Sequence, residues 1–345
     1  MTHPLHLSTA AFDYECPQKL IAQHPYPDRA ASRLLHLDRA SGTAVHKHFV
    51  NLIELLDPGD ALVINTSRVI NARLHGVRQN GAPAEVLLVH PDTDDTWIAM
   101  VHPGGKLKVG RTVRFDDDAE LEITGVIGGG LRRVRLTGLD WRKLMDKYGA
   151  VPLPPYIARG PERKDQERYQ TVYAREDGSV AAPTAGLHFT ADLLGQIEQR
   201  GVHVNEVVLH VGPGTFKPVG VDNPADHIMH AEWYRVSQET ANTVNAVREA
   251  GRRVWAVGTT VARVLETVGR DGTMRPVEGW TKLFIYPPYD FHIVDGLITN
   301  FHLPRSTLLM LVAAFAGVDN VLAAYRSAVA ERYRLYSYGD AMVVV

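Results

Sequence analysis

A change of pattern part-way along the chain is the feature that most limits its fold. Between about residues 68 and 135, short runs rich in β-branched residues alternate with Gly, Asp and Pro clusters, and no helical period interrupts them. That spacing is typical of a small antiparallel barrel or sandwich. The predicted strands in this segment cover 86–89, 97–101, 112–115, 121–124 and 134–136.

The segments on either side have a different pattern, in which strands alternate with helices. Short apolar strands are predicted at 34–37 and 61–64, before the β-rich segment. A helix at 141–148 and a Pro-rich turn at 151–155 follow it. Alternation of this kind favours a mostly parallel sheet covered by helices. The later elements are predicted as helices at 191–200, 237–250, 259–268, 306–316 and 320–332, and as strands at 204–211, 253–258 and 341–345.

We therefore predict an α/β fold in two domains. The first is a large α/β domain with a mostly parallel sheet, and the second is a small β-barrel domain inserted into it. The large domain is predicted to be discontinuous, with residues 1–65 and 151–345, and the barrel to take residues 66–150. A length of 345 residues agrees with this division, because an average domain has about 150 residues.

Composition and charge exclude several classes of protein. The 37 Lys and Arg against 39 Asp and Glu leave a net charge of −2, which excludes a strongly basic nucleic-acid coat. The longest apolar run, 308–318, is shorter than a membrane span. Residues 1–6 lack the basic and apolar segments of a signal peptide. We expect a cytoplasmic globular protein without a membrane partner, and we favour a monomer.

Metal binding is not expected from this sequence. The single cysteine, Cys16, excludes an intramolecular disulfide and a Cys-based zinc site. His227, His230 and Glu232 lie within six positions, but not at the His-Glu-x-x-His spacing of a zinc site. The alternative for such a group is general acid–base chemistry by imidazoles and a carboxylate gathered in a cleft.

Three turns could bind a ligand, although each can also be an ordinary turn. The stretch Pro-Thr-Ala-Gly-Leu-His-Phe-Thr (183–190) places His188 beside small residues and ends at Thr190, a predicted helix N-cap. The stretch Gly-Pro-Gly-Thr-Phe (212–216) follows a strand, where open α/β sheets bind ligands. The helix start at Thr259 and Thr260 has free N–H groups that favour a carboxylate or phosphate, unless the threonines are simple caps.

Two basic runs suggest an RNA partner. The first is 132–135, and the second is 159–168, which lies among Tyr156, Tyr169 and Tyr173. Basic residues mixed with aromatic ones are typical of proteins that bind single-stranded or looped RNA. The alternative is a solvated charged surface.

Long stretches of the chain are more specific than any of these short motifs. They include Leu-Ile-Ala-Gln-His-Pro (20–25), Val-Pro-Leu-Pro-Pro-Tyr-Ile (151–157), Arg-Tyr-Gln-Thr-Val-Tyr-Ala (168–174), Pro-Thr-Ala-Gly-Leu-His-Phe-Thr (183–190) and Tyr-Gly-Asp-Ala-Met (338–342). With them, the chain resembles the S-adenosylmethionine:tRNA ribosyltransferase-isomerases of queuosine synthesis nearly end to end.

The resemblance implies an α/β domain with an inserted β-barrel, and an unusual reaction. S-adenosylmethionine would donate its ribosyl unit rather than a methyl group. The acceptor would be 7-aminomethyl-7-deazaguanine at the tRNA wobble position, and isomerisation would give epoxyqueuosine while adenine and methionine leave. S-adenosylmethionine would thus be consumed as a substrate, so no cofactor is expected. The implied partners are S-adenosylmethionine and the tRNA anticodon loop.

The matched motifs also imply site residues. A base must take the proton beside the sulfonium and an acid should help adenine leave. We expect these roles to be shared, in an order left open, by His188, His230 and Glu232. The expected substrate contacts are Arg68, Thr184, Gly186, His210, Gly212, Gly214, Thr215, Phe216, Thr259, Thr260, Asn300 and His302. The expected tRNA contacts are Arg132, Arg133, Arg135, Arg159, Arg163, Lys164 and Arg168.

Four places depart from the usual family pattern. Asn-Asp-Thr-Arg-Val-Ile-Pro-Ala-Arg-Leu stands here as Asn-Thr-Ser-Arg-Val-Ile-Asn-Ala-Arg-Leu (65–74), which lacks an Asp and a Pro. Val261 and Val264 replace hydroxyl residues, Pro213 replaces Leu, and Ala231 replaces Ser. Two other functions therefore stay open: ribosyl transfer to a free small molecule, and RNA binding without catalysis.

Overall fold

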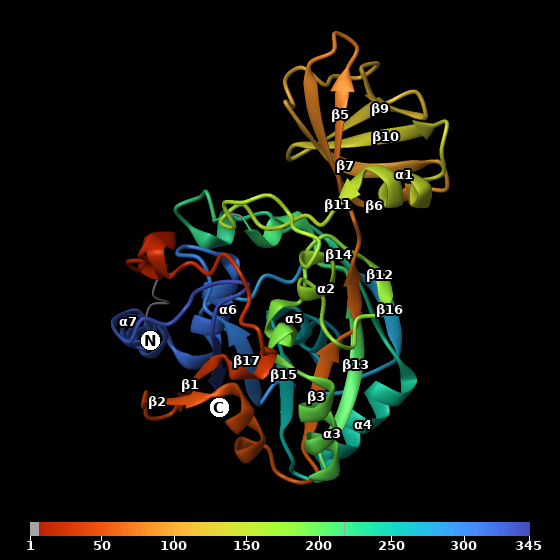
Figure 1. Cartoon of the computed structure of the whole chain (residues 1–345). Helices are drawn as coiled ribbons and strands as arrows, with labels where there is room; N and C mark the ends of the chain where they lie inside the picture. The colour runs from red at the N-terminus through yellow and green to blue at the C-terminus, as the bar shows by residue number, and fades with distance from the viewer. Residues whose placement is uncertain (1–6, 217) are drawn as a thin grey trace.

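The computed structural model of the chain describes residues 7–216 and 218–345. The expectation of no signal peptide rests on residues 1–6, which lie outside this description. Figure 1 shows a large body built on one extended sheet and a small barrel, coloured orange to yellow, standing on one end of it. We use the names large body and barrel for these two parts below.

One sheet organises the large body. Its strands lie in the order β16 (Val277–Thr281), β14 (Glu232–Val236), β13 (His203–Leu209), β3 (Ala61–Asn65), β15 (Val254–Val257), β17 (Gly296–Asn300), β18 (Ala341–Val344), β1 (Arg33–Leu37) and β2 (Ala44–His48). The centre is parallel, because β13, β3, β15 and β17 run in one direction. Antiparallel strands flank it, among them β14 and β16 at one edge. The predicted α/β class is confirmed, with a sheet that is mixed.

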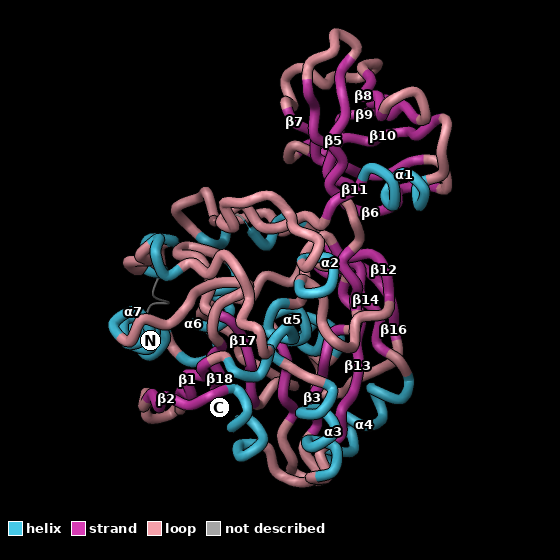
Figure 2. The backbone as a smooth tube through the Cα atoms, in the orientation of Figure 1, coloured by secondary structure: helices cyan, strands magenta, loops and turns pink. Residues whose placement is uncertain are grey.

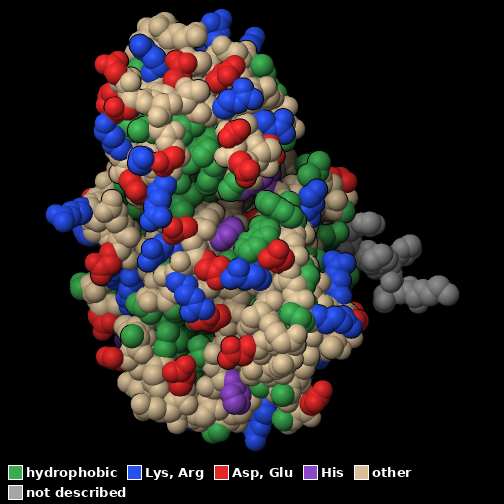
Figure 3. All heavy atoms as spheres, turned by 90° about the vertical axis from the view of Figure 1, so that its right-hand side faces the viewer, with side chains coloured by type: hydrophobic (Ala, Val, Ile, Leu, Met, Phe, Trp, Pro, Cys, Tyr) green, Lys and Arg blue, Asp and Glu red, His purple; other side chains and the backbone are tan. Residues whose placement is uncertain are grey.

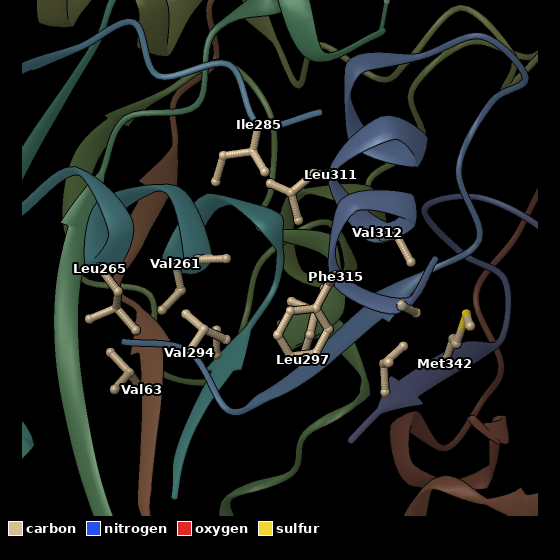
Figure 4. Packing of buried hydrophobic residues seen from close by; sticks show 14 of the residues in the cluster. Val63, Val261, Leu265, Ile285, Val294, Leu297, Leu311, Val312, Phe315 and Met342 are labelled. Atoms are coloured by element: carbon tan, nitrogen blue, oxygen red, sulfur yellow. The ribbon is translucent and has the colours of Figure 1, made fainter. Parts of the chain in front are cut away.

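Helices cover both faces of this sheet. They are α3 (Ala191–Gln199), α4 (Gln238–Glu249), α5 (Thr259–Val268), α6 (Thr307–Ala316), α7 (Val318–Ala330) and the 3-10 helices η4 (Phe49–Leu55) and η5 (Thr184–His188). Side chains alternate across a strand, so Val63 belongs to the apolar cluster that contains residues of α4 to α7, while its neighbour Leu62 belongs to the cluster with α3 and η4. Figure 4 shows the first of these layers, where Val261 and Leu265 of α5 approach Val63.

Local sequence determines where several helices begin. Thr190 and Ser306 accept hydrogen bonds from the backbone N–H of the residue three positions on, at 3.1 and 3.2 Å. The predicted cap at Thr190 is thus confirmed. Helix α5 begins differently, after Gly258 with a φ of 95°, and neither Thr259 nor Thr260 caps it with its side chain. Glycine adopts this φ without strain, which allows β15 to pass directly into α5.

The barrel is a closed ring of strands joined by tight turns. It consists of β5 (Arg73–Arg78), β6 (Pro83–Thr93), β7 (Thr96–His102), β8 (Thr112–Phe115), β9 (Ala119–Gly128) and β10 (Leu131–Thr137), followed by α1 (Trp141–Tyr148) and β11 (Gly149–Ala150). Pairing of β5 with both β6 and β8 closes the ring. Its apolar core is separate from the cores of the large body. Figure 2 shows the chain entering and leaving the barrel close to β11.

A small parallel sheet lies between β3 and the barrel. It pairs β4 (Ser67–Val69) with β12 (Glu176–Ser179), while the strands of the closed ring begin at Arg73. The domain boundary at residue 66 stays a prediction. The remaining elements are α2 (Asp165–Arg168), η1 (Thr9–Phe12), η2 (Gln18–Leu20), η3 (Arg29–Ala31), η6 (Pro213–Phe216) and η7 (Pro224–Asp226).

The helices of this chain are short or interrupted by polar residues. Within residues 7–216 and 218–345, no single helix is long and apolar enough to cross a membrane. Helices α6 and α7 pass that test only as a pair bent by 114°, and the apolar residues of both pack in the core.

The buried carboxylate of Glu266 on α5 yields a prediction about stability. It accepts hydrogen bonds from the backbone N–H groups of His292, Ile293 and Val294 at 2.9, 2.9 and 3.0 Å. Each buried donor left unpaired costs about 1–3 kcal/mol. We therefore expect Glu266→Ala to lower the free energy of unfolding in urea by at least about 3 kcal/mol. The exposed Glu249→Ala serves as the control and should change it by less than about 0.5 kcal/mol.

Candidate active site

A cavity of about 1640 Å³ lies between the barrel and the large body. The barrel contributes His90, Trp97 and Arg142 to its walls, and the large body contributes Glu232 and Trp233. Figure 3 shows hydrophobic side chains and histidines in the hollow below the barrel. Pockets for one small ligand usually measure about 300–1,000 Å³, so this cavity has room for two reactants.

The cavity lies at the carboxyl end of the parallel strands. His210 and Gly212 come just after β13, and Arg68 comes shortly after β3, and all three line the cavity. This is the edge at which open α/β sheets bind ligands, because the connections that leave it diverge and create a crevice.

His210 is held by a chain of hydrogen bonds that ends at a backbone amide. Its Nδ1 lies 2.8 Å from Ser67 Oγ, and Ser67 Oγ lies 2.6 Å from Ser179 Oγ. Ser179 Oγ in turn accepts the N–H of Val211 at 2.9 Å. Both serines are fully buried. We refer to these two hydroxyls as the serine relay.

The serine relay determines which ring nitrogen of His210 carries the proton. Among the described residues, the partners of Ser179 Oγ are the Val211 amide, which can only donate, and Ser67 Oγ; the Ser179 hydroxyl therefore donates to Ser67, and the hydroxyl of Ser67 donates to Nδ1. Every hydroxyl proton then has an acceptor. The proton of the neutral ring therefore resides on Nε2, which makes Nε2–H a hydrogen-bond donor.

The ring of His210 is also restrained by packing. It stacks on Trp233 with 5.0 Å between centroids and 22° between planes. A Cβ at Gly178 would lie 2.5 Å from Cε1 of His210, so only glycine allows this approach. Burial lowers the pKa of His210 below its ordinary value, and the ring is neutral at pH 7.

Glu232 provides a carboxylate with both oxygens occupied. Oε1 accepts the N–H of Gly212 at 2.8 Å, and Oε2 forms an ion pair with Arg263 of α5. Arg263 also donates to the carbonyl of Leu283 at 2.9 Å. Both charged side chains are buried, and Glu232 lines the cavity at the foot of β14. The carboxylate is thus fixed at the cavity wall.

A second cavity of about 40 Å³ contains other predicted substrate contacts. Asn300 lines it, and the Oδ1 atom of Asn300 is buried and has no hydrogen-bond partner among the described residues. The segment from Gly212 to Thr215 runs from one cavity to the other, because Gly212 lines the large cavity and Thr215 lines the small one. The small cavity is also lined by two more of the predicted residues, Thr184 and His302.

His188 is enclosed rather than exposed to the large cavity. Its Nδ1 lies 2.8 Å from Ser32 Oγ, and its Nε2 accepts from Asn300 Nδ2 at 3.0 Å. Its ring stacks on Phe49. Burial lowers the pKa of His188 to about 3, so the imidazole is neutral and both nitrogens are used inside the protein.

The other predicted residues have different positions. His230 is exposed and lies between two glycines, because a Cβ at Gly214 or at Gly129 of the barrel would lie 3.0 or 3.5 Å from its ring. Gly186 is buried, and a Cβ there would lie 2.1 Å from the Tyr173 hydroxyl. The side chain of Phe216 lies outside the described part of the chain. Neither cavity is lined by Thr259 or Thr260, which are both buried.

The first basic run, 132–135, mostly forms hydrogen bonds and ion pairs within the barrel. Arg132 donates to backbone carbonyls, including those of Gly104 and Leu107 at 3.4 Å. Arg133 forms an ion pair with Asp92. Arg135 is exposed on β10, and none of the three lines the large cavity.

The second basic run contributes more to the cavity. Arg159 forms two hydrogen bonds to Asp165, at 2.6 and 2.9 Å. Arg168 donates to the backbone carbonyls of 26–27 at 2.6 and 3.0 Å. The large cavity is lined by the other two members of the run, the exposed Arg163 and Lys164.

Sequence reasoning missed several residues that build the site. Ser67 and Ser179 lie 112 positions apart, and only the pairing of β4 with β12 brings their hydroxyls together. Arg263 lies four residues after Thr259, within the otherwise apolar helix α5. An arginine among apolar helix residues is a signal that could have predicted a buried carboxylate partner. No signal in the sequence marked the cavity residues Arg142 and Trp280.

Comparison with known proteins places the whole chain in one family. The sequence pattern of the family described as queuosine biosynthesis protein matches residues 9–344. The chain belongs to this family. It is 50% identical over 345 residues to the S-adenosylmethionine:tRNA ribosyltransferase-isomerase of Heliobacterium modesticaldum, covering 98% of this chain and 100% of that protein. The identity to the protein of the same name from Symbiobacterium thermophilum is 52% over 342 residues, which covers 97% and 98%.

A solved structure of the family has a similar fold. It is the S-adenosylmethionine tRNA ribosyltransferase of Thermotoga maritima, with 40% sequence identity and a TM-score of 0.57. The match covers 97% of this chain and all of that one. The resemblance seen in the sequence motifs is thus confirmed.

The departures from the family pattern fall in two kinds of place. Val261 and Val264 are fully buried in the core of the large body, so the hydroxyls they replace would face apolar packing. Ala231, in contrast, lines the large cavity beside Glu232. Among residues 7–216 and 218–345, no three His, Cys, Asp or Glu side chains are placed to hold a metal ion. The absence of a metal stays a prediction.

The enclosed histidines predict how stability depends on pH. Burial lowers the pKa of both His188 and His302 to about 3, against about 6.5 in an unfolded chain. Below pH 6.5 the unfolded chain therefore binds protons that the folded chain does not. The free energy of unfolding should be largest above pH 6.5 and fall towards pH 3, by up to about 1.4 kcal/mol per pH unit for each histidine. Urea titrations from pH 7 to pH 5 measure this slope, and an equal slope in His302→Gln would contradict the assignment.

The serine relay predicts the tautomer of His210. In the native chain, ¹⁵N NMR of labelled histidine should show the proton on Nε2, with His210→Gln used to assign the signal. Ser67→Ala removes one hydrogen bond, about 1 kcal/mol, and should shift the tautomer ratio roughly fivefold towards Nδ1–H. Ser67→Thr retains the hydroxyl and should retain the native ratio. An unchanged ratio in Ser67→Ala would show that the relay does not control the ring.

Proposed function

We propose that this chain transfers the ribosyl unit of S-adenosylmethionine to 7-aminomethyl-7-deazaguanine at the tRNA wobble position and isomerises it to epoxyqueuosine, with release of adenine and methionine. Membership of the family over residues 9–344 and the names of its relatives support this activity. The observation that carries it in the structure is the cavity between barrel and large body, which has room for both reactants and contains a fixed carboxylate and a neutral histidine.

The reaction needs an anion near the sulfonium. The positive sulfur acidifies the neighbouring ribose carbon, and a base must take the proton. We assign this role to Glu232, because a carboxylate attracts the cation and accepts the proton from the same position.

The reaction also needs a donor for the leaving adenine. We assign this role to His210 as a hydrogen-bond donor, because the serine relay leaves Nε2–H as its donor atom and the residue lines the same cavity. The neutral ring keeps this proton, and adenine takes up the proton that Glu232 has removed from the ribose carbon. His188, for which the sequence predicts catalysis, is assigned a positioning role, since it contacts Asn300 rather than the large cavity. No metal or further cofactor takes part, and S-adenosylmethionine is consumed.

We propose that tRNA binds across the opening of the large cavity. Five cationic side chains line this cavity, and four of them are exposed: Arg68 and Arg142 near the barrel, and Arg163 and Lys164 on the large body. Their exposure suits contacts to phosphates, which position a nucleic acid. The wobble base is unpaired in its loop, so turning it into the cavity costs little.

The proposed function is tested with the full chain, S-adenosylmethionine and tRNA that carries the deazaguanine, in the presence of a chelator. Adenine and methionine should accumulate together while the tRNA gains the mass of the ribosyl-derived group. Formation of S-adenosylhomocysteine would instead show methyl transfer, and rescue of a chelated enzyme by a metal would overturn the metal-free assignment. Equal turnover of the free base without salt dependence would identify a small-molecule enzyme. Binding of tRNA without any adenine release would identify a non-catalytic relative.

A further inference from the structure

A row of aromatic rings crosses the large cavity from the sheet to the barrel. His210 stacks on Trp233 at 5.0 Å, and Trp233 of β14 lies directly opposite Trp280 of β16 in the antiparallel register. Trp280 then meets His90 of the barrel strand β6 edge-to-face, with 5.0 Å between centroids. All four rings line the cavity. The row therefore connects the proposed adenine donor with the opposite wall.

Trp280 is the most exposed ring of this row. It retains 52% of its accessible surface and stands on β16, the edge strand of the large sheet. An exposed tryptophan inside a cavity leaves a large apolar face without a partner, which is typical of a binding site. Trp280 also lies in the same cavity as the exposed cationic side chains of Arg142 and Arg163. Cationic groups beside a free aromatic face favour single-stranded nucleic acid over other ligands.

We propose that Trp280 is the stacking site for a second base of the tRNA, one that neighbours the modified base in the anticodon loop. This inference rests on the proposed function and adds a subsite to it. The modified base would occupy the part of the cavity near His210 and Glu232, and its neighbour would stack on Trp280. Neighbouring bases in an unpaired loop can separate in this way, because they are recognised singly by stacking on aromatic side chains.

The test measures steady-state adenine release by Trp280→Ala and Trp280→Phe. Loss of one base–aromatic stack should raise the KM for tRNA in Trp280→Ala by roughly 5- to 100-fold. The KM for S-adenosylmethionine and kcat at saturating tRNA should stay within about twofold. Trp280→Phe keeps a ring and should recover most of the affinity. Val277→Ala, an exposed position on the same strand outside the cavity, is the matched control and should change neither KM.

Two further measurements separate stacking from a structural role. Two anticodon stem-loops are compared, one with an abasic residue on the 5′ side of the modified base and one with it on the 3′ side. The substrate that lacks the base stacked on Trp280 should have the same KM with the native protein and with Trp280→Ala. A KM rise that persists with both abasic substrates would overturn the proposal. The proposal would also be overturned if His90→Ala raised the KM for tRNA as much as Trp280→Ala does. Trp280 would then act through its contact with His90, by positioning the barrel against the large body.

Failure of the inference can be distinguished from failure of the proposed function. Quenching of tryptophan fluorescence by the stem-loop, measured without S-adenosylmethionine, reports binding whether or not the chain is catalytic. One outcome is that the stem-loop quenches the fluorescence of the native protein but not that of Trp280→Ala, while no adenine is released. This outcome would support the stacking site and contradict the catalytic function. Adenine release with an unchanged KM for tRNA in Trp280→Ala would support the function and contradict the stacking site.

Discussion

The buried ion pair between Glu232 and Arg263 is the interaction on which the site depends most. It joins β14, near one edge of the sheet, to α5, and the same two side chains bind the N–H of Gly212 and the carbonyl of Leu283. Removing one partner of such a pair costs about 3–5 kcal/mol, because the other charge stays buried without compensation. The pair therefore fixes β14, and with it Trp233, against the turn that follows β13.

The geometry of the cavity follows from where the barrel is inserted. The chain leaves the large sheet at the carboxyl end of β3, so the barrel stands over the edge at which parallel strands present their functional residues. His210 and Glu232 come from the sheet side, and His90 and Arg142 come from the barrel. One wall can thus carry the chemistry while the other contributes contacts to a larger substrate. An inserted domain of this kind enlarges a cleft without altering the packing of the core.

Much of the fold could be predicted from local sequence, whereas the edge of the sheet could not. Helices α1 and α5 begin and end at the predicted residues, because apolar periodicity and flanking Asp, Gly or Thr mark them. Strands β14 and β16, and the central strand β17, were missed, since each is only five residues long and is interrupted by charged, polar or glycine residues. Such strands form because a neighbouring strand provides hydrogen-bond partners for their backbone N–H and C=O groups. The local sequence of each segment does not reveal which strand will be its neighbour. The residue proposed to stack a base, Trp280, lies on one of them.

The sequence by itself determined which parts of the chain form a barrel and which an α/β sheet, and its motifs identified the family. It also named Glu232 and His210 among the candidate site residues. Only the tertiary structure decided which histidine lines the large cavity. His188 meets Ser32 across 156 positions and is enclosed, while His210 meets Ser67 across 143 positions and lines the cavity. Burial and hydrogen-bond partners determine the proton on an imidazole, and both depend on segments far apart in the sequence.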